Sequence, residues 1–355
     1  FMINLDVFES PGLLVYPDRV KRNIAKAIEM VDGNPSRLRP HIKTHKTKEV
    51  NDLLLEAGIN KFKCATIAEA ELLALSNAPD VLLSMQLIGP NISRFQQLKE
   101  AYPSTRFSSI IDDIHAAEAL NEAFEGKNTG VYIDLNMGMN RTGIRPEKAF
   151  DLIQQLRRLP HVSLRGLHAY DGHIRDKEFQ EREKHVNSDF VSFYQLIDQL
   201  DTKDLELVVS GTPSFLVHHK NPLFTCSPGT FVFFDAGYAA LFPENTFEFG
   251  VEIISRIISK PTETTICLDL GHKSVAAENP IDNRVRFIDR PEWILKSQSE
   301  EHGIVEVGNS SAYQIGEIVT MVPYHICPTV NLHSHLQVID GGLWEVKARN
   351  RRLCY

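Results

Sequence analysis

The stretch Leu38-Arg39-Pro40-His41-Ile42-Lys43 guides the interpretation of this chain, because a short strand-like run ends in a lysine and leads at once into a helical pattern. A dense group of cations and imidazoles continues through Lys46. A lysine at the end of a buried strand loses hydration, and neighbouring positive charge disfavours its protonated form further. Both effects would lower the pKa of Lys43 and make its amine a nucleophile, which a Schiff-base lysine requires. A solvated basic turn is the alternative interpretation.

Similar strand-like runs recur as far as residue 235, and helical patterns separate them. One of these helical patterns opens with the capping box Thr66-Ile67-Ala68-Glu69. Alternating strands and helices imply a parallel sheet, and eight such units imply a closed (β/α)8 barrel of the TIM type. A doubly wound open sheet is the alternative. After an opening strand at residues 13–16, the eight candidates are residues 38–43, 62–66, 81–86, 107–111, 131–136, 164–170, 205–210 and 231–235.

The sequence pattern changes after about residue 242, where strand-like runs become frequent and helical patterns disappear. Asp340-Gly341-Gly342, between two apolar runs, is a hairpin signal. We therefore expect an α/β barrel domain over residues 9–245 and an all-β domain over residues 246–355, which residues 1–8 join. The strand candidates of the second domain are residues 251–259, 265–270, 285–288, 304–307, 317–322 and 336–346.

The composition is that of an ordinary globular protein of 355 residues, of which 24% are charged and 43% hydrophobic. No apolar run approaches the length that spans a bilayer, so no membrane partner is expected. The net charge of −8 argues against general nucleic-acid binding. The five cysteines are widely spread, which suits reduced thiols in the cytoplasm better than a disulfide framework.

Several polar side chains fall where predicted barrel strands end, which is where the active site of such a barrel lies. One such group is the run Ser210-Gly211-Thr212-Pro213-Ser214. Gly211 permits close backbone approach, Thr212 can cap a helix and Pro213 suits the first turn of that helix. The helix N-terminus would then bind an anion such as phosphate, although an ordinary cap is the alternative. Beside a Schiff-base lysine, the turn suggests pyridoxal phosphate. The groups are Lys43, Asn136 with Arg141, His168 and Tyr170 with His173, and Ser210-Gly211-Thr212-Pro213-Ser214.

The run Pro323-Tyr324-His325-Ile326-Cys327-Pro328 suggests a metal site in the second domain. On a strand, residues i and i+2 point to one face, so His325 and Cys327 would converge. Imidazole plus thiolate is a zinc-type pair, and two protein ligands leave open positions for water or substrate, as a catalytic metal needs. A buried thiol beside a polar histidine is the alternative.

Six segments, taken in order along nearly the whole chain, together resemble the D-threonine aldolase and D-serine dehydratase branch of the alanine-racemase-like (fold type III) pyridoxal phosphate enzymes. The resemblance implies an N-terminal (β/α)8 barrel and a C-terminal β domain, as the patterns suggest independently. It also implies a homodimer in which the β domain of one subunit closes over the barrel mouth of the other, so that the metal pair would act in trans. The segments are residues 38–46, 64–73, 134–144, 166–173, 300–303 and 323–331.

The resemblance further implies roles for individual residues. Lys43 would bind pyridoxal phosphate covalently, Arg141 would lie near the cofactor ring, and Tyr170 and the Ser210-Gly211-Thr212 turn would help seat it. Lys46 is close to Lys43, so the choice between the two rests on the resemblance and on the strand-end argument.

His325 and Cys327 match the divalent-metal pair of the family, with zinc foremost and manganese or magnesium as alternatives. The D-serine dehydratases of the family carry His-x-Cys on zinc, whereas many of its D-threonine aldolases have a carboxylate in place of the thiol. Cys327 therefore tilts the comparison toward the dehydratases.

These parts predict a pyridoxal phosphate- and metal-dependent lyase whose substrate is a D-amino acid with a β-hydroxyl group. The cofactor would act as an electron sink and the metal as a Lewis acid at the hydroxyl. In a D-serine dehydratase, Lys43 would remove the α-proton and the hydroxyl would depart. In a D-threonine aldolase, a base such as His168 or His173 would take the hydroxyl proton, and the Cα–Cβ bond would break.

Two other functions fit part of the pattern. An amino acid racemase needs acid and base groups on both faces of the cofactor, but it leaves the His-x-Cys pair without a task. A non-catalytic pyridoxal phosphate-binding protein would need only the barrel, whereas this chain continues into a β domain.

Overall fold

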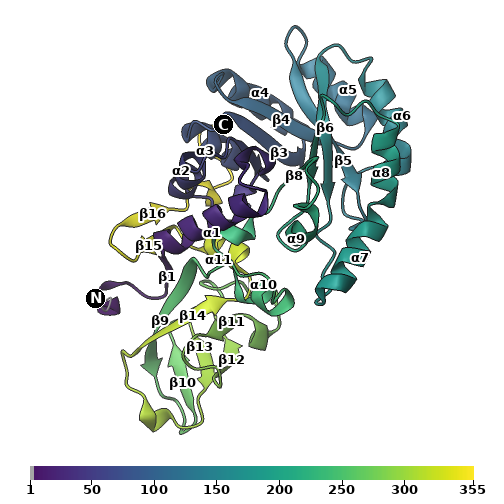
Figure 1. Ribbon diagram of the computed structural model, residues 1–355. Coiled ribbons are helices and arrows are strands. Elements are labelled where there is room, and N and C mark those ends of the chain that lie inside the picture. Colours follow the sequence, from purple (N-terminus) through teal and green to yellow (C-terminus); the bar gives the residue numbers. More distant parts are fainter. Residues whose placement is uncertain (1–3) are drawn as a thin grey trace. The chain divides into compact units, whose positions relative to one another are not determined.

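The computed structural model describes residues 4–355, which form two compact units (Figure 1). Helices α1 (Pro17–Met30) and α2 (Lys48–Glu56) each begin in the first unit and end in the second. The predicted placement of residues 1–3 with the β domain lies outside the described residues. The first unit contains residues 4–24, 44–49 and 230–349, and the second contains residues 25–43, 50–229 and 350–355.

The second unit is built on a parallel sheet whose strands, β2 to β8, lie in chain order. Helices come between consecutive strands, so the predicted α/β class and TIM-type architecture are confirmed, with seven regular strands in this sheet of the described chain where eight were expected. The strands are β2 (Lys61–Cys64), β3 (Asp80–Gln86), β4 (Arg106–Ile111), β5 (Thr129–Asn136), β6 (Val162–Tyr170), β7 (Glu206–Val209) and β8 (Phe224–Cys226). The helices are α3 (Ile67–Leu75), α4 (Pro90–Ala101), α5 (Ile114–Ala123), α6 (Pro146–Leu156), α7 (Phe179–Asp189), α8 (Val191–Asp198) and α9 (Phe215–His218).

The predicted first strand, residues 38–43, is not a regular strand, so that expectation is wrong. Leu38 and His41 form single parallel bridges to β8 and to β2, respectively. Pro40 has no N–H to donate to a ladder, and the chain then turns through the 3-10 helix Ile42–Thr44. The segment still fills the position between β8 and β2, which brings the lysine that ends it to the carboxyl ends of the strands.

A buried ion network lies at the opposite, amino ends of these strands. The Arg39 guanidinium is fully buried and donates to Asp80 at 2.8 Å and to Glu206 at 2.6 Å. Burial alone would raise the pKa of Glu206, but the charges of Arg39 and Lys61 lower it to about 2. Tyr132 donates to the same carboxylate at 2.6 Å and joins the network to the apolar core. The core cluster consists of Leu82, Ile110, Tyr132 and Val208.

The first unit is built on a mainly antiparallel sheet, in which β9 pairs with β1, β10 and β14. The strand β9 is an apolar run rich in β-branched residues and is buried over most of its length. The predicted hairpin at Asp340-Gly341-Gly342 is confirmed, since β15 and β16 pair antiparallel on either side of it. The strands are β1 (Gly12–Val15), β9 (Val251–Ser259), β10 (Thr265–Leu268), β11 (Val285–Phe287), β12 (Ile294–Gln298), β13 (Gly303–Glu306), β14 (Ile318–Pro323), β15 (His335–Val338) and β16 (Leu343–Glu345).

Three segments of the first unit differ from the sequence-based expectation. The predicted strand at residues 231–235 is wrong: the 3-10 helix Thr230–Val232 stands there, and α10 (Ala236–Leu241) follows. A short, continuously apolar run can be either a strand or a buried turn, because periodicity does not separate the two. The helix α11 (Ile326–Leu332) and the strand β12 were not predicted. Across residues 4–355, no helix combines the length and apolar character needed to cross a membrane.

Candidate active site

A pocket opens at the carboxyl ends of the strands in the second unit, where the active site was predicted. Tyr170 ends β6, while Lys43 reaches the pocket from the short 3-10 helix that follows the irregular segment. Five predicted residues thus come together, since Asn136, Arg141 and His168 also line the pocket. Further lining residues are His41, Lys63, Ser84, Asp134, Met137 and Met139.

Three cationic side chains surround the ring of Tyr170. The Nζ atoms of Lys43 and Lys63 lie 5.9 and 5.5 Å from the ring centroid, and the guanidinium carbon of Arg141 lies 5.4 Å from it. Each distance is within the range of a cation–π contact. Positive charge gathered at the mouth of a pocket favours an anionic ligand, such as a phosphate or an amino acid carboxylate.

Lys63, on β2, is a buried lysine that the sequence analysis did not single out. Its Nζ lies 3.3 Å from Nε2 of His168, whose Nδ1 lies 2.7 Å from Oδ1 of Asp134. Burial, followed by the charge of Lys43, lowers the pKa of Lys63 to about 7. Burial and the Lys63 charge also lower the pKa of His168, against the opposing effect of Asp134. These side chains form a buried chain in which the Lys63 amine changes its protonation state near neutral pH.

The position of Tyr170 depends on two glycines. A Cβ atom on Gly172 would lie 2.2 Å from the Tyr170 hydroxyl oxygen, and one on Gly211 would lie 2.9 Å from Cε2 of the ring. Neither distance is compatible with a side chain larger than hydrogen unless the ring moves. The close approach predicted at Gly211 is therefore made by the tyrosine ring.

The Ser210-Gly211-Thr212 turn is buried, but its hydrogen bonding differs from the prediction. Oγ1 of Thr212 accepts a hydrogen bond from the Gly229 N–H at 3.3 Å, so this hydroxyl joins two loops. The helix α9 begins only after Ser214 and has four residues, so the expectation that Thr212 caps it is wrong. The backbone of the turn, with Ser210 at a φ of 69°, is the feature that could hold a phosphate.

A buried carboxylate supports this turn from the protein interior. Oδ1 of Asp171 accepts from the Ser214 hydroxyl at 2.6 Å, and Oδ2 lies 2.7 Å from Nε2 of His218. The Gly211 N–H in turn donates to Oγ of Ser214 at 3.4 Å. Burial works to raise the pKa of Asp171, but His218 and the hydrogen bonds lower it overall. Sequence analysis missed this network, because Asp171 and His218 are far apart in the chain.

His173, predicted as a catalytic base, is not among the described residues that line the pocket. Its Nε2 instead lies 2.8 Å from Oδ2 of Asp189 on α7. Within the pocket, His168 therefore remains the candidate base. Lys63 could have been found from its spacing: Lys61 and Lys63 alternate with Phe62 on one strand, which places both lysines on the same face.

His325 and Cys327 lie in the first unit, and the expectation that they share a strand is wrong. The strand β14 ends at Pro323, and His325 is the N-cap residue of α11. The helix starts here because the Ile326 N–H donates to Oδ2 of Asp235 at 3.1 Å, which satisfies one of its free N–H groups. The two candidate ligands nevertheless meet, since a side-chain hydrogen bond joins them.

The surroundings of this pair are polar on both sides. Nδ1 of His325 lies 2.6 Å from Oε1 of Glu278, and Sγ of Cys327 lies 3.2 Å from Oγ1 of Thr44 and 3.5 Å from Oγ1 of Thr230. Burial would lower the pKa of His325, but Cys327, through its hydrogen bond and charge, raises it to about 9 overall. A carboxylate on one ring nitrogen is the usual support of a metal-binding histidine.

Both sets of residues fit the groups predicted from the sequence. A lysine amine, a cationic pocket wall and a buried turn next to Tyr170 are what pyridoxal phosphate needs for covalent attachment and for its phosphate. Nitrogen and sulfur donors on adjacent side chains, with Glu278 orienting the imidazole, suit a zinc-type divalent ion.

Comparison with known proteins places the chain among characterised enzymes. D-threonine aldolase of Arthrobacter sp is 26% identical over 356 residues, with 96% of this chain and 93% of that protein covered. D-serine dehydratase of Dictyostelium discoideum is 22% identical, with 95% of each chain covered. The crystal structure of D-threonine aldolase from Filomicrobium marinum superimposes with a TM-score of 0.88 at 27% identity, covering 98% of this chain and 97% of that one.

Family models account for both parts of the chain. Residues 250–339 match the putative serine dehydratase domain. Residues 15–237, more than half of the chain and the part that holds the pocket, match the N-terminal domain of alanine racemase. The chain therefore belongs to the alanine racemase N-terminal domain family, in the branch of fold type III pyridoxal phosphate enzymes that includes D-threonine aldolase and D-serine dehydratase.

Proposed function

We propose that this protein is a lyase that depends on pyridoxal phosphate and a divalent metal and that acts on a D-amino acid with a β-hydroxyl group. The observation that carries the proposal is the pocket in which Lys43, Lys63 and Arg141 gather around Tyr170, next to the His168–Asp134 pair. The pocket supplies a nucleophilic amine, anion-binding charge and a proton-transfer chain in one place.

The residues of the chain have separate tasks in this proposal. Lys43 would hold the cofactor and take the α-proton at Nζ, and Arg141 would neutralise negative charge near the cofactor ring. Bound pyridoxal phosphate would supply an electron sink for the charge that develops at Cα. Nε2 of His168 would accept the hydroxyl proton, and Lys63 would relay it, because the pKa of Lys63 is about 7.

His325 and Cys327 are the residues that would hold the divalent ion, with zinc foremost and manganese or magnesium as the alternatives. Such an ion supplies Lewis acidity, which stabilises negative charge on a departing or ionising β-hydroxyl. Glu278 would fix the orientation of the imidazole ring through its contact of 2.6 Å with Nδ1.

Two reactions fall within this class, and a different observation supports each. Dehydration is favoured by Cys327, because the resemblance implies a thiolate ligand in D-serine dehydratases. Retro-aldol cleavage is favoured by the similarity to the D-threonine aldolases, at 26% and 27% identity. Dehydration removes the α-proton and the β-hydroxyl group, whereas retro-aldol cleavage breaks the Cα–Cβ bond. The products therefore distinguish the two reactions.

The deciding experiment is product analysis after incubation with D-serine and with D-threonine, each with and without a chelator. A keto acid and ammonia, both lost on chelation, would establish the dehydratase. Glycine and an aldehyde would establish the aldolase. Formation of the L-enantiomer alone, unaffected by the chelator, would overturn the proposal in favour of a racemase. Cofactor binding without any turnover would instead support a non-catalytic binding protein.

A homodimer in the cytoplasm completes the proposal. Its support is the resemblance to a family of dimers and the set of five cysteines, none of which forms a disulfide in the described part of the chain. Light scattering coupled to size-exclusion chromatography would give the mass directly. A monomeric mass would contradict the dimer. Full activity of that monomer would also show that the metal pair does not need to act in trans.

A further inference from the structure

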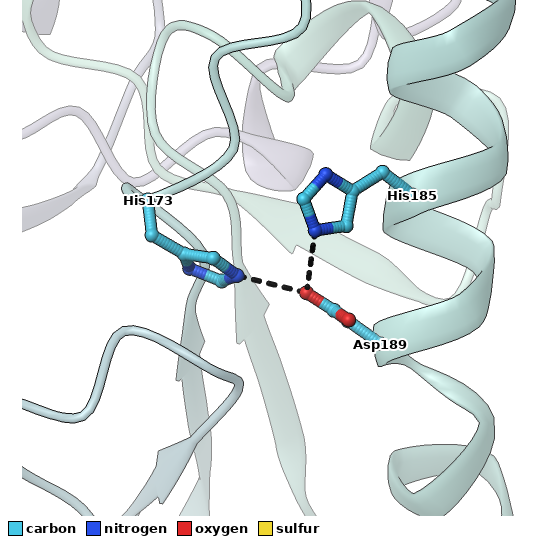
Figure 2. Close-up of side chains that lie close together, drawn as sticks. All are labelled: His173, His185 and Asp189. Atoms are coloured by element: carbon cyan, nitrogen blue, oxygen red, sulfur yellow. Dashed lines mark hydrogen bonds and ion pairs between the residues drawn. The ribbon is translucent and has the colours of Figure 1, made fainter.

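Two histidines and an aspartate of the second unit meet outside the pocket (Figure 2). His173 lies in the loop after β6, and His185 and Asp189 lie on α7. Oδ2 of Asp189 is 2.8 Å from Nε2 of His173 and 3.6 Å from Nε2 of His185. The three donor atoms all lie within 4.8 Å of one another, and all three residues are half-buried. The imidazole rings lie nearly at right angles, at 80°.

The spacing of these residues follows from the helix. His185 and Asp189 are four residues apart, so they occupy one face of α7, one turn from each other. A helical i,i+4 pair of donors is a frequent way to present two ligands to one metal ion. The third donor arrives from a loop at the carboxyl end of β6, and the site is therefore built from two elements of different kinds.

A second carboxylate orients one of the histidines. Nδ1 of His185 lies 2.7 Å from Oδ2 of Asp176, which leaves Nε2 directed toward Asp189. Hydrogen bonding of the far ring nitrogen to a carboxylate fixes the tautomer and raises the basicity of a metal-binding histidine. The arrangement of His185 thus has the supporting contact that metal ligands in proteins typically have.

Gly138 keeps the space beside these donors open. A Cβ atom at this position would lie 2.7 Å from Nε2 of His173 and 3.3 Å from Oδ2 of Asp189, so any side chain would press on two of the donor atoms. The φ angle of Gly138 is +114°, which other residues rarely adopt. Both the conformation and the close approach therefore require glycine here.

We propose that His173, His185 and Asp189 bind a divalent transition-metal ion of the zinc class. A tetrahedral ion with bonds of about 2.0 to 2.2 Å needs neighbouring donor atoms roughly 3.3 Å apart. The two separations from Oδ2 of Asp189, 2.8 and 3.6 Å, lie on either side of that value, and the donor nitrogens of the two histidines lie within 4.8 Å of each other. Three protein ligands leave a fourth position for water, and the nitrogen–oxygen donor set differs from the His325–Cys327 pair.

This site would also tie together segments that border the pocket. Gly138 lies between Met137 and Met139, both of which line the pocket, and a Cβ atom on it would press on the donor atoms of His173 and Asp189. An ion at this position would therefore join the loop after β6 to α7. Gly138, in the loop that follows β5, would lie beside the ion's ligands. The expected consequence is thermal stabilisation of the folded protein by the ion, since ligands that bind only the native state raise its stability.

The test uses Co²⁺ as the probe in tag-free, cofactor-loaded protein that carries Cys327→Ala and His325→Ala, so that the other metal pair is removed. We expect one equivalent of Co²⁺ to bind, with visible d–d absorption and without a thiolate-to-metal charge-transfer band. Adding His185→Ala should weaken binding by more than about 100-fold, and adding Asp176→Asn by about 10- to 100-fold. His115→Ala is the matched control, because His115 pairs with Glu118 on the surface of the same unit.

Two results would overturn the proposal. The first is the absence of any Co²⁺ spectrum in the His325→Ala/Cys327→Ala protein at millimolar metal, while its circular dichroism matches the parent. The second is an unchanged spectrum after His185→Ala. Melting curves of the His325→Ala/Cys327→Ala protein with and without Zn²⁺ provide an independent measure: in this background, the zinc-dependent rise in Tm should persist after His115→Ala and disappear after His185→Ala.

Discussion

The buried Nζ of Lys63 lies 3.3 Å from Nε2 of His168, and this contact joins a lysine to a histidine–aspartate pair in the lining of the pocket. Both residues are buried, and the charge of Lys63 acts on the protonation of His168. Burial, followed by the charge of Lys63, lowers the pKa of His168, so a charged Lys63 disfavours a proton on this imidazole.

Replacing Lys63 with Met should remove a pH dependence of stability. The pKa of Lys63 is about 7 in the folded protein, below the ordinary value, so the unfolded chain binds more protons between about pH 7 and pH 10. The stability of the cofactor-free parent should therefore rise over this interval, by roughly 3 kcal/mol, relative to Lys63→Met. Urea denaturation at pH 7 and pH 9.5 measures the difference. The exposed Lys203→Met variant should behave like the parent, and an equal rise in Lys63→Met would refute the prediction.

Lys43, and not Lys46, should carry the cofactor. Lys43→Ala should abolish the mass increase that follows borohydride reduction of the loaded protein and should lower kcat by at least about 1,000-fold, because the nucleophilic amine is lost. Lys46 has a φ of +55°, so Lys46→Asn, which tolerates this conformation, is the suitable control and should keep the attachment. Intact attachment in Lys43→Ala would move the assignment to another lysine.

Cys327→Asp should change the preference for the metal rather than abolish binding. A carboxylate replaces a soft thiolate by a hard oxygen donor, which disfavours Zn²⁺ relative to Mn²⁺ and Mg²⁺. We expect the ratio of activities with Mn²⁺ and Zn²⁺ to increase at least about tenfold over the parent. Metal-depleted enzyme titrated with each ion provides the measurement. Cys354→Ser, at an exposed cysteine outside any disulfide, is the control and should leave the ratio unchanged.

Arg39→Met should be strongly destabilising, because it leaves the Asp80 and Glu206 carboxylates without their shared buried cation. Loss of one partner of a buried ion pair costs about 3 to 5 kcal/mol. The pKa of Glu206 is held at about 2, so its contribution is fully present above about pH 4.5 and is lost as the pH falls toward 2. Denaturation at pH 7 and pH 4 should show the parent losing more stability on acidification than Arg39→Met does. Equal losses in both would contradict the role assigned to this arginine.

The repeating alternation of strands and helices, together with the later run of strands, was sufficient to predict the fold class from the sequence. Such patterns are local, since the spacing of apolar residues within one helix or strand indicates which face of that element is buried. The positions of Lys43, Arg141 and Tyr170 near one another also followed, because the carboxyl ends of parallel strands meet at one end of a barrel. The irregular closing segment was missed, because Pro40 interrupts an otherwise strand-like run.

The contacts that govern chemistry were decided only by the tertiary structure. Lys63 and His168 are 105 residues apart in the chain, and Asp171 and His218 are 47 apart, so no local pattern relates them. The meeting of His325 with Cys327 was expected for the wrong reason, since Asp235 starts a helix where a strand was predicted. The sequence by itself determined the elements, the class of fold and the residue types available for catalysis. The folded structure determined which of these groups lose their water together, and it is this shared burial that shifts their pKa values and gives them their reactivity.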